Sequence, residues 1–262
     1  MIVGLDIGRS SVKLYDGEQV LNFPSIVGEW RERKLKSSFS KNDLEIEFQG
    51  ERYFVGALAE NESEFSRSMM TDNKCHDDTL ILALTALHQA NITVCRVVTG
   101  LPIKSHDAVN KARLKTLLQG RHEITVNGES KDIIIKSVDV AAEGGAAFWS
   151  NPRPGLIRLI DGGSKTINFV TMKDKKYVDR DSGTLDFGFE TNKSVNDKQL
   201  IARIAGDLGK KWGSNDKIVT AGGKADLLAD HLRTYFSNVG PIKDALYANA
   251  IGYYNIGRII HV

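Results

Sequence analysis

Cysteine is scarce in this sequence. Only two cysteines occur among its 262 residues, Cys75 and Cys95. They do not form a Cys-x-x-Cys pair, and no histidine cluster stands near them. This pattern excludes a cysteine-based zinc site and favours free thiols in a reducing cytosol.

Net charge and long apolar runs are lacking as well. The 35 basic and 33 acidic residues leave a net charge of only +2, so the overall balance calls for neither a nucleic-acid nor an acidic-membrane partner. No stretch approaches the roughly 20 apolar residues that span a bilayer, and the opening MIVGLDIG has no basic region. We therefore expect a soluble, cytoplasmic protein that binds neither membrane nor nucleic acid directly.

What the sequence does contain is the pattern of an α/β protein. Its hydrophobic fraction of 41% suffices for a packed core in one large or two modest domains. Apolar periodicity predicts strands at 2–6, 11–15, 44–48, 52–56, 93–100, 123–126, 133–140, 156–160, 166–172, 177–178 and 217–221, and helices at 77–90, 105–118, 143–149, 195–212, 225–235 and 243–258. The Asn-Pro-Arg-Pro-Gly segment at 151–155 breaks any helix and predicts a domain boundary there.

The two halves of the chain open in the same way. Residues 3–13 read Val-Gly-Leu-Asp-Ile-Gly-Arg-Ser-Ser-Val-Lys, and residues 158–168 read Arg-Leu-Ile-Asp-Gly-Gly-Ser-Lys-Thr-Ile-Asn. Each has an apolar strand, an aspartate, any residue, a glycine, a hydroxyl-rich turn and a second strand. One Asp-x-Gly turn is usually structural, but two of them, each beginning its own half, indicate a shared purpose.

Such a pair suits the binding of a metal-triphosphate. Glycine lets the backbone approach a phosphate closely, amide N–H groups and hydroxyls donate to its oxygens, and an aspartate at a strand end holds hydrated Mg²⁺. Two of these turns facing one another would clamp a triphosphate between two lobes.

The pair resembles the phosphate-1 and phosphate-2 loops of the actin, Hsp70 and sugar-kinase superfamily, and in detail those of its ParM-like plasmid-segregation branch. Asp6, Gly8 and Lys13 keep the family spacing of acid, glycine and phosphate-binding lysine. Further segments are similar in order and position, and together they cover essentially the whole chain: 23–27, 53–59, 99–103, 143–146, 220–226 (the adenosine motif) and 248–252 (the closing helix).

The resemblance implies a two-lobed, ribonuclease H-like α/β fold with a central nucleotide cleft. Its first lobe would be residues 1–150, with subdomains IA and IB and with part of the final segment 243–262 packing back on it. The second lobe would be residues 151–262. Only about 60 residues separate the second phosphate loop from the adenosine motif, which is short for the family. The outer subdomain IIB would therefore be missing or vestigial, as in the AlfA-like actins, and subdomain IIA would remain.

The resemblance also implies the site residues, with ATP or GTP and Mg²⁺ as cofactors. Asp6 and Asp161 would hold Mg²⁺ through water, and Glu143 would orient the attacking water as general base. Asn168 stands where related loops often carry an acid. The implied nucleotide-binding residues are Gly8, Arg9, Ser10, Ser11, Lys13, Gly162, Gly163, Ser164, Lys165, Thr166, Gly222, Gly223, Lys224 and Asp226, with purine contacts extending to 203–211.

Several of these residues have a second interpretation. Arg9 is unusual in a phosphate loop and either contacts a phosphate or points to solvent. Glu143 also suits a helix N-cap partner, and Gly222 with Gly223 also suits a simple strand-to-helix turn. The basic segment 30–36 fits either a contact with a partner or subunit or a solvated loop.

The function implied is a filament-forming ATPase whose subunits assemble head-to-tail. It would segregate plasmid copies through a DNA-binding adaptor at a centromere-like site. Two rival functions are a small-molecule kinase of the same superfamily, for which the chain is short and lacks an obvious acceptor-binding insertion, and a nucleotide-binding scaffold without turnover.

Overall fold

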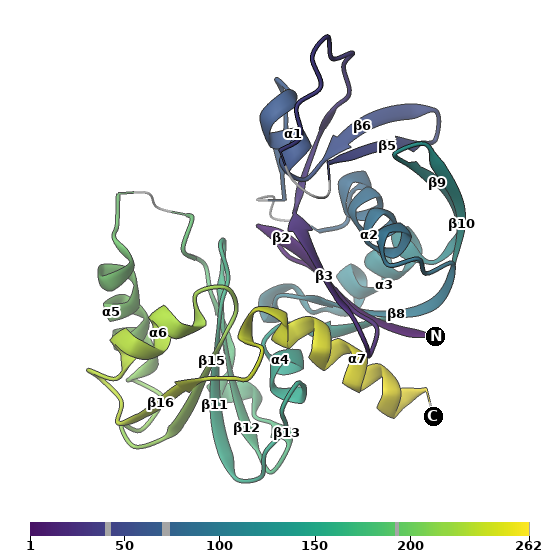
Figure 1. Cartoon of the computed structure of the whole chain (residues 1–262). Coiled ribbons are helices and arrows are strands. Elements are labelled where there is room, and N and C mark those ends of the chain that lie inside the picture. The colour runs from purple at the N-terminus through teal and green to yellow at the C-terminus, as the bar shows by residue number, and fades with distance from the viewer. Residues whose placement is uncertain (40–42, 70–73, 192–193, 262) are drawn as a thin grey trace. The chain divides into compact units, whose positions relative to one another are not determined.

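The protein consists of two compact units, each built on its own β-sheet (Figure 1). The computed structural model describes all residues except 40–42, 70–73, 192–193 and 262, the last of which ends the predicted final segment. The first unit comprises residues 1–99, 108–140 and 261, and the second comprises 100–107 and 141–260. Within the described ranges no helix has the length and apolarity needed to cross a membrane.

The first unit is organised around β1 (Ile2–Ile7), whose residues from Val3 to Ile7 are all buried. It pairs antiparallel with β2 (Ser11–Tyr15) and parallel with β8 (Val94–Leu101). The described strands of this sheet run in the order β3-β2-β1-β8-β10-β9-β5-β6-β4-β7. The remaining ones are β3 (Val20–Pro24), β4 (Ile26–Glu29), β5 (Leu44–Phe48), β6 (Glu51–Val55), β7 (Arg67–Ser68), β9 (Gly120–Val126) and β10 (Glu129–Ala142).

Three helices accompany this sheet in the described part of the chain. Helix α2 (Asp77–Gln89) is buried from Thr79 to His88 and lies against β1, β2 and β9. Helix α1 (Ala57–Glu62) packs on β4 and β6, while α3 (Ala108–Leu118) buries only Leu114 and Leu118 and leaves most of its surface exposed. The core of the unit is therefore the space between α2 and the sheet.

The second unit has a sheet in the order β13-β12-β11-β15-β16, with β14 pairing with β12 as well. The strands are β11 (Leu156–Gly162), β12 (Ile167–Lys173), β13 (Lys176–Tyr177), β14 (Gly183–Leu185), β15 (Lys217–Ala221) and β16 (Asn238–Pro241). Short 3-10 turns occur at 103–105, 179–181 and 245–247. Because β13 and β14 both pair with β12, the strands described between β12 and β15 extend this sheet and form no second sheet.

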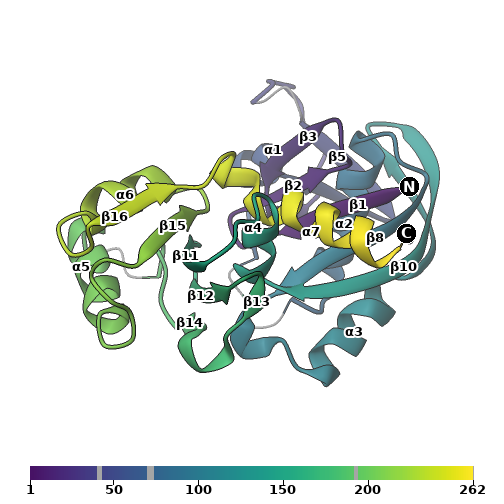
Figure 2. The same ribbon diagram turned by 90° about the horizontal axis from the view of Figure 1, so that it is seen from below.

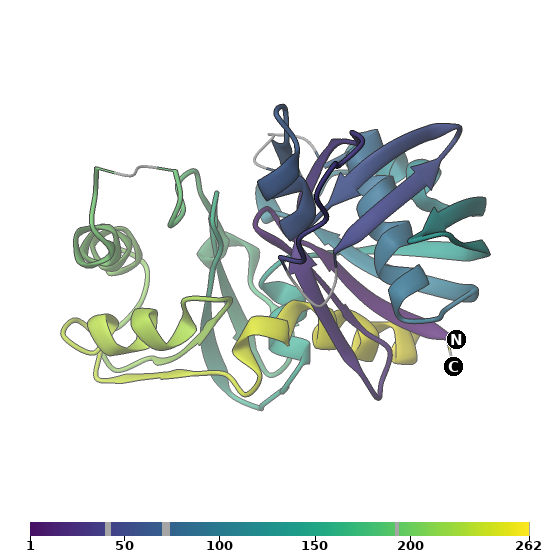
Figure 3. The same cartoon turned by 45° about the horizontal axis from the view of Figure 1, so that its top comes forward.

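Alternation along the strands gives the second sheet two apolar faces. Ile160, Ile167 and Ile218 belong to the cluster that includes α5 (Asp197–Leu208) and α6 (Ala225–Leu232), which lie side by side (Figure 3). Leu159 and Val170 belong to the cluster with α4 (Gly145–Trp149) and α7 (Ala248–Ile260) (Figure 2). Because successive side chains of a strand point to opposite faces, helices cover both sides of this sheet.

Most predicted elements occur in the structure, and the differences arise at their ends. The helix predicted at 195–212 begins at Asp197, because the Asn196 side chain caps it in a capping box with Gln199, and it ends at Leu208. The helix predicted at 143–149 begins only at Gly145, and the one predicted at 225–235 ends at Leu232. The last helix begins at Ala248 instead of 243, since Asp244 is left-handed (φ 52°) and residues 245–247 form a 3-10 turn.

Other elements were not predicted at all, namely β3, β4, β7, β14, β16 and α1. They are short, and β16 (Asn-Val-Gly-Pro) exists only through its parallel pairing with β15. The compact units also divide at 140/141, ten residues before the predicted boundary, because α4 packs closely against α7 within the second unit.

The contact between α4 and α7 predicts a stability effect. A Cβ atom on Gly252 of α7 would lie 1.8 Å from the Ala146 carbonyl oxygen. We expect Gly252→Ala to lower the free energy of unfolding of the second unit by about 3 kcal/mol, because backbone cannot move aside as a flexible side chain does.

Gly206→Ala is the matched control, measured in the same chemical denaturation series. Gly206 is an exposed residue of α5, where no described heavy atom comes within 4 Å of the added carbon. Its replacement should raise stability by roughly 0.5–1 kcal/mol through helix propensity. Equal effects of the two substitutions would contradict close packing of α4 on α7.

Candidate functional site

The first sequence-predicted turn closes the β1–β2 hairpin in the first unit. Asp6 is paired across the strands with Lys13, whose Nζ lies 3.5 Å from Asp6 Oδ2 and 3.3 Å from the Ser11 carbonyl oxygen. The Gly8 N–H donates to that same Ser11 oxygen at 3.1 Å. A Cβ on Gly8 would lie 2.6 Å from this oxygen, so only glycine closes the turn this tightly. Ser10 is exposed at the turn, and Ser11, the first residue of β2, is half-buried.

Two other segments of the first unit, around Ser25 and Met69, hold this first turn in place. The Ser25 N–H donates to the Ser10 carbonyl at 2.9 Å, and the Met69 N–H donates to the Ser25 carbonyl at 3.2 Å. Arg9 completes the brace, because its Nη1 donates to the Met69 carbonyl at 2.9 Å. Its guanidinium thus holds the turn to the rest of its unit, an arrangement that neither interpretation of the sequence had included.

The second turn, in the second unit, repeats this construction. Asp161 on β11 pairs with Asn168 on β12, as Asp6 pairs with Lys13. The Gly163 N–H donates to the Thr166 carbonyl at 3.1 Å, and a Cβ on Gly163 would lie 2.8 Å from that oxygen. The repeat seen in the sequence is therefore a repeat of hairpin register and turn geometry, with an amide standing where the first turn has its lysine.

Residues around the second turn hold it on both sides. A Cβ on Gly162 would lie 2.5 Å from Leu228 on α6, and the Ser164 hydroxyl donates to Glu190 Oε1 at 3.0 Å. The Phe189 and Glu190 N–H groups donate to the carbonyls of residues 163 and 164. Lys165 and Thr166 are half-buried within the turn itself.

Glu143 lies between β10 and α4, and its side chain is directed at the second turn. The residue is only 8% exposed, and its Oε2 accepts a hydrogen bond from Asn168 Nδ2 at 3.3 Å. Thr184 on β14 donates to Asn168 Oδ1 at 2.8 Å. Gly144 is the residue that precedes α4, so Glu143 lies just outside the helix.

Asn249, near the start of α7, joins the two carboxyl-bearing segments. Its Nδ2 donates to Asp161 Oδ2 at 2.8 Å, and its Oδ1 accepts from the Gly144 N–H at 3.1 Å. Since a backbone N–H can only donate, the amide oxygen must face Gly144 and the amide nitrogen must face Asp161. Asn249 was not among the predicted site residues; its one signal was a polar side chain among the apolar residues and glycine of 248–252.

The predicted adenosine segment lies against the second turn. Gly222 has φ +90°, and a Cβ there would be 2.5 Å from the Gly162 carbonyl oxygen. Gly223 differs, because an added Cβ would meet only Leu246 at an ordinary 3.7 Å among the described atoms. Packing therefore demands glycine at 222 but leaves it unexplained at 223.

The other two predicted residues of this segment are exposed. Lys224 Nζ lies 3.3 Å from Asp197 Oδ2, an exposed ion pair that contributes little to stability. Asp226 lies in the first turn of α6. Both side chains are therefore available to a ligand at little cost to the fold.

The second unit thus brings together Glu143, Asp161, the second turn and the glycine pair, while the first unit holds Asp6, Lys13 and the first turn. In the described part of the chain no three His, Cys, Asp or Glu side chains are grouped so as to hold a metal by themselves. Because Asp6 and Asp161 belong to different units, their convergence on one hydrated Mg²⁺ stays a prediction.

The cysteines play no part in these arrangements. Both are free thiols, as predicted. Burial raises the pKa of Cys95 to about 12, and burial likewise raises the pKa of Cys75, with Arg113 opposing the shift. Both thiols are therefore protonated at neutral pH and poor nucleophiles.

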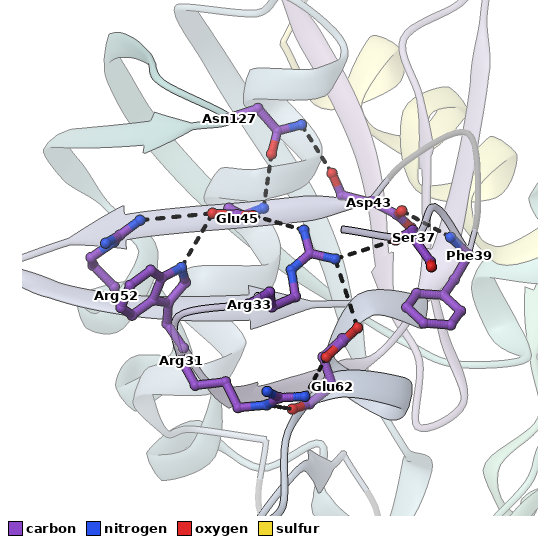
Figure 4. Close-up of polar contacts among 10 residues, drawn as sticks. Arg31, Arg33, Ser37, Phe39, Asp43, Glu45, Arg52, Glu62 and Asn127 are labelled. Carbon is purple, nitrogen blue, oxygen red and sulfur yellow. Dashed lines mark hydrogen bonds and ion pairs between the residues drawn. The ribbon is translucent and has the colours of Figure 1, made fainter. Parts of the chain in front are cut away.

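The basic segment 30–36 is anchored within the first unit (Figure 4). Arg33 lies 2.9 Å from Glu45 Oε1 and 3.8 Å from Glu62 Oε1, and Trp30 Nε1 donates to Glu45 Oε2 at 3.2 Å. Burial acts to raise the pKa of the Glu45 carboxyl, but the bonds from Arg33 and Trp30 lower it. Lys34, Leu35 and Lys36 remain exposed, so the segment is fixed at its base and solvated at its tip.

Comparisons with known proteins agree with this construction. A family model described as the N-terminal domain of actin-like proteins matches residues 4–145, more than half of the chain. No curated protein matches the sequence.

Among solved structures the fold is similar to three filaments. An AlfA filament bound to AMPPNP is 22% identical, with 100% of this chain and 98% of that chain covered and a TM-score of 0.77. AlfA from the B. subtilis plasmid pLS32 is 24% identical (96% and 97% covered, TM-score 0.77). A 15-stranded ParM filament from Clostridium botulinum is 23% identical (98% and 99% covered, TM-score 0.82). The predicted two-lobed α/β fold with a reduced second lobe is thereby confirmed.

The hydrogen bonds from Asn249 to Asp161 and Gly144 predict the effect of exchanging the amide and the carboxylate. Asn249→Asp would set a carboxylate beside that of Asp161, and we expect it to destabilise the second unit by about 2 kcal/mol through repulsion and a lost hydrogen bond. Adding Asp161→Asn should recover most of the loss, because the new carboxylate on α7 would then accept from both the new amide on β11 and the Gly144 N–H. Chemical denaturation of the two single variants and the double variant measures this coupling, and purely additive losses would contradict the bridge.

Proposed function

The chain belongs to the family of actin-like proteins, and on this premise we propose that it is an ATPase whose subunits assemble head-to-tail into filaments. The observation that carries the proposal is the pair of glycine-closed turns, each following a strand that carries a buried aspartate. Support comes from three of the similar structures, which are filaments, one of them with AMPPNP bound. Head-to-tail contacts produce open filaments when the rotation between subunits does not close into a ring.

The residues of the two turns fit a nucleoside triphosphate. Each turn combines a glycine without room for a side chain, hydroxyls at its tip and a polar residue opposite the aspartate. Lys13 supplies the positive charge in the first turn. Gly223 supplies a surface against which a base can lie, which accounts for a glycine that packing leaves unexplained.

In the proposed mechanism the phosphates are bound by two sets of groups. Gly8, Ser10, Ser11 and Lys13 act from the first unit, and Gly163, Ser164 and Thr166 act from the second, through N–H groups, hydroxyls and the ammonium. Mg²⁺, when bound, neutralises charge on the phosphates. Asp6 and Asp161, each buried in its own unit, would hold it through water.

Glu143 is proposed to orient the attacking water and to accept its proton. Its position supports this role, because the carboxylate is buried, oriented by Asn168 and adjacent to the second turn. Gly222, Gly223, Lys224 and Asp226 take the nucleoside, which is adenosine in this proposal, with guanosine as the alternative. Nucleotide binding favours the assembling form, and hydrolysis weakens subunit contacts.

The biological role proposed is the segregation of plasmid copies. Similarity to AlfA from plasmid pLS32 supports it. The net charge of only +2 favours an adaptor protein over direct contact with DNA. We propose that this adaptor binds a centromere-like DNA site and the filament.

Sedimentation and phosphate release test the function together. We expect the wild-type protein to pellet with ATP and Mg²⁺ and to release phosphate. Glu143→Ala should still bind nucleotide and pellet, but its phosphate release should fall at least about 100-fold, because general base catalysis contributes factors of that order.

Glu47→Ala, which removes an exposed carboxylate from β5, should behave like the wild type. ADP formation without pelleting, dependent on an added sugar or acid that itself becomes phosphorylated, would instead identify a small-molecule kinase. Nucleotide binding without any release by the wild type would identify a scaffold.

Gly223 predicts a loss of affinity without a loss of stability. Gly223→Ala should weaken ATP binding about tenfold, because the methyl group takes space needed by the nucleoside. Gly240→Ala is the control, since Gly240 of β16 also has ample room, with no described atom within 4 Å of the added carbon. Calorimetric titration gives the affinities and thermal melts give the stabilities; equal affinities for the two variants would exclude Gly223 from the nucleoside site.

A further inference from the structure

We propose that Thr184 is a positioning residue that orients the Glu143 carboxylate through Asn168. The inference rests on the proposed function, because it assigns further residues to the step that Glu143 performs. No sequence pattern indicates this role: Thr184 lies in the three-residue strand β14, which no pattern predicts, and Asn168 stands where related loops often carry an acid.

The sheet places the three polar side chains in one row. Asp161 on β11 is paired with Asn168 on β12, and Asn168 is paired on its other side with Thr184 on β14. Directly paired residues of antiparallel strands share a face of the sheet. This is the face that carries Leu159 and Val170 and that α4 and α7 cover, so the row points to the segment where Glu143 lies.

The hydrogen bonds along this row run in one direction only. The Lys104 N–H donates to Thr184 Oγ1 at 3.3 Å, and the hydroxyl proton is then directed to Asn168 Oδ1 at 2.8 Å. Because a carboxylate can only accept, the Asn168 amide turns its nitrogen to Glu143 Oε2 at 3.3 Å and its oxygen to the Thr184 hydroxyl. Thr184 thus holds the end of the buried amide that faces away from the carboxylate.

Burial makes this orientation effective. Asn168 is 2% exposed and Glu143 is 8% exposed, so water competes little for either group. Without the hydroxyl, Asn168 Oδ1 would lose this donor, and the amide that donates to the carboxylate would be held at one end only. The Glu143 carboxylate would then be less firmly oriented.

A neutral amide also suits the site better than an acid. An aspartate at 168 would set a second carboxylate within hydrogen-bonding distance of Glu143, and two such groups resist simultaneous ionisation. The Asn168–Thr184 pair orients Glu143 without adding a negative charge.

The first test compares Thr184→Val with Thr184→Ser in steady-state phosphate release. Valine keeps the shape and removes the hydroxyl, so kcat should fall about tenfold while KM for ATP stays within twofold. Serine restores the hydroxyl, and kcat should return to at least half of the wild-type value. Thr234→Val is the control, because the Thr234 hydroxyl donates to the His231 carbonyl at the end of α6 and should leave kcat unchanged.

Asn168→Asp provides a second variant should Thr184→Val prove poorly folded by thermal melting. It should move the acid limb of the kcat–pH profile to higher pH, since the added carboxylate competes with Glu143 for the ionised state. An unshifted profile would contradict the proposal.

A stability cycle separates this proposal from the function on which it rests. The stability losses of Thr184→Val and Glu143→Gln in chemical denaturation should be non-additive, because each substitution changes one hydrogen-bond partner of the Asn168 amide. Normal kcat in Thr184→Val, with release by the wild type intact, overturns the positioning role alone. Absence of release by the wild type overturns the proposed function, and additive stabilities would then also exclude the hydrogen-bonded relay.

Discussion

The second unit depends on holding two buried carboxylates with amide groups. Asp161 and Glu143 are each less than a tenth exposed, and a buried carboxylate is costly unless hydrogen bonds replace water. Asn249 donates to the first and Asn168 to the second. The Gly144 N–H can only donate and the carboxylates can only accept, so both amides have a defined orientation and each carboxylate is held before any ligand arrives.

This arrangement explains how a repeated hairpin acquired two different roles. Both turns have the same register and the same glycine closure, which is what close approach to a phosphate requires. Opposite the aspartate, the first hairpin has Lys13 and the second has Asn168. The lysine places a positive charge beside Asp6, whereas the asparagine donates a hydrogen bond to Glu143. The two hairpins thus share a backbone geometry but differ in the side-chain contact made opposite the aspartate.

The two faces of the second sheet divide the work in a similar way. One face carries the apolar core under α5 and α6, and the other carries α4, α7 and the polar row that begins at Asp161. Close packing of Gly252 on Ala146 fixes α7 against α4. Asn249, three residues earlier on α7, is therefore held where it reaches both Gly144 and Asp161. The helix packing on this face of the sheet therefore also positions the Asn249 side chain against Asp161.

The sequence by itself determined the features that depend only on residues close together in the chain. The glycine-closed turns, the acids that precede them and the periodic helices such as α2 depend on backbone conformation and side-chain period within a few positions, so they could be predicted, and the resemblance of their order identified the fold. Only the tertiary structure decided the rest. Asn249 reaches Asp161 across 88 positions, Arg9 bonds to Met69 across 60, and Thr184 meets Asn168 through a strand too short for any pattern to mark. Such contacts depend on which faces pack together, and that information is spread over the whole chain.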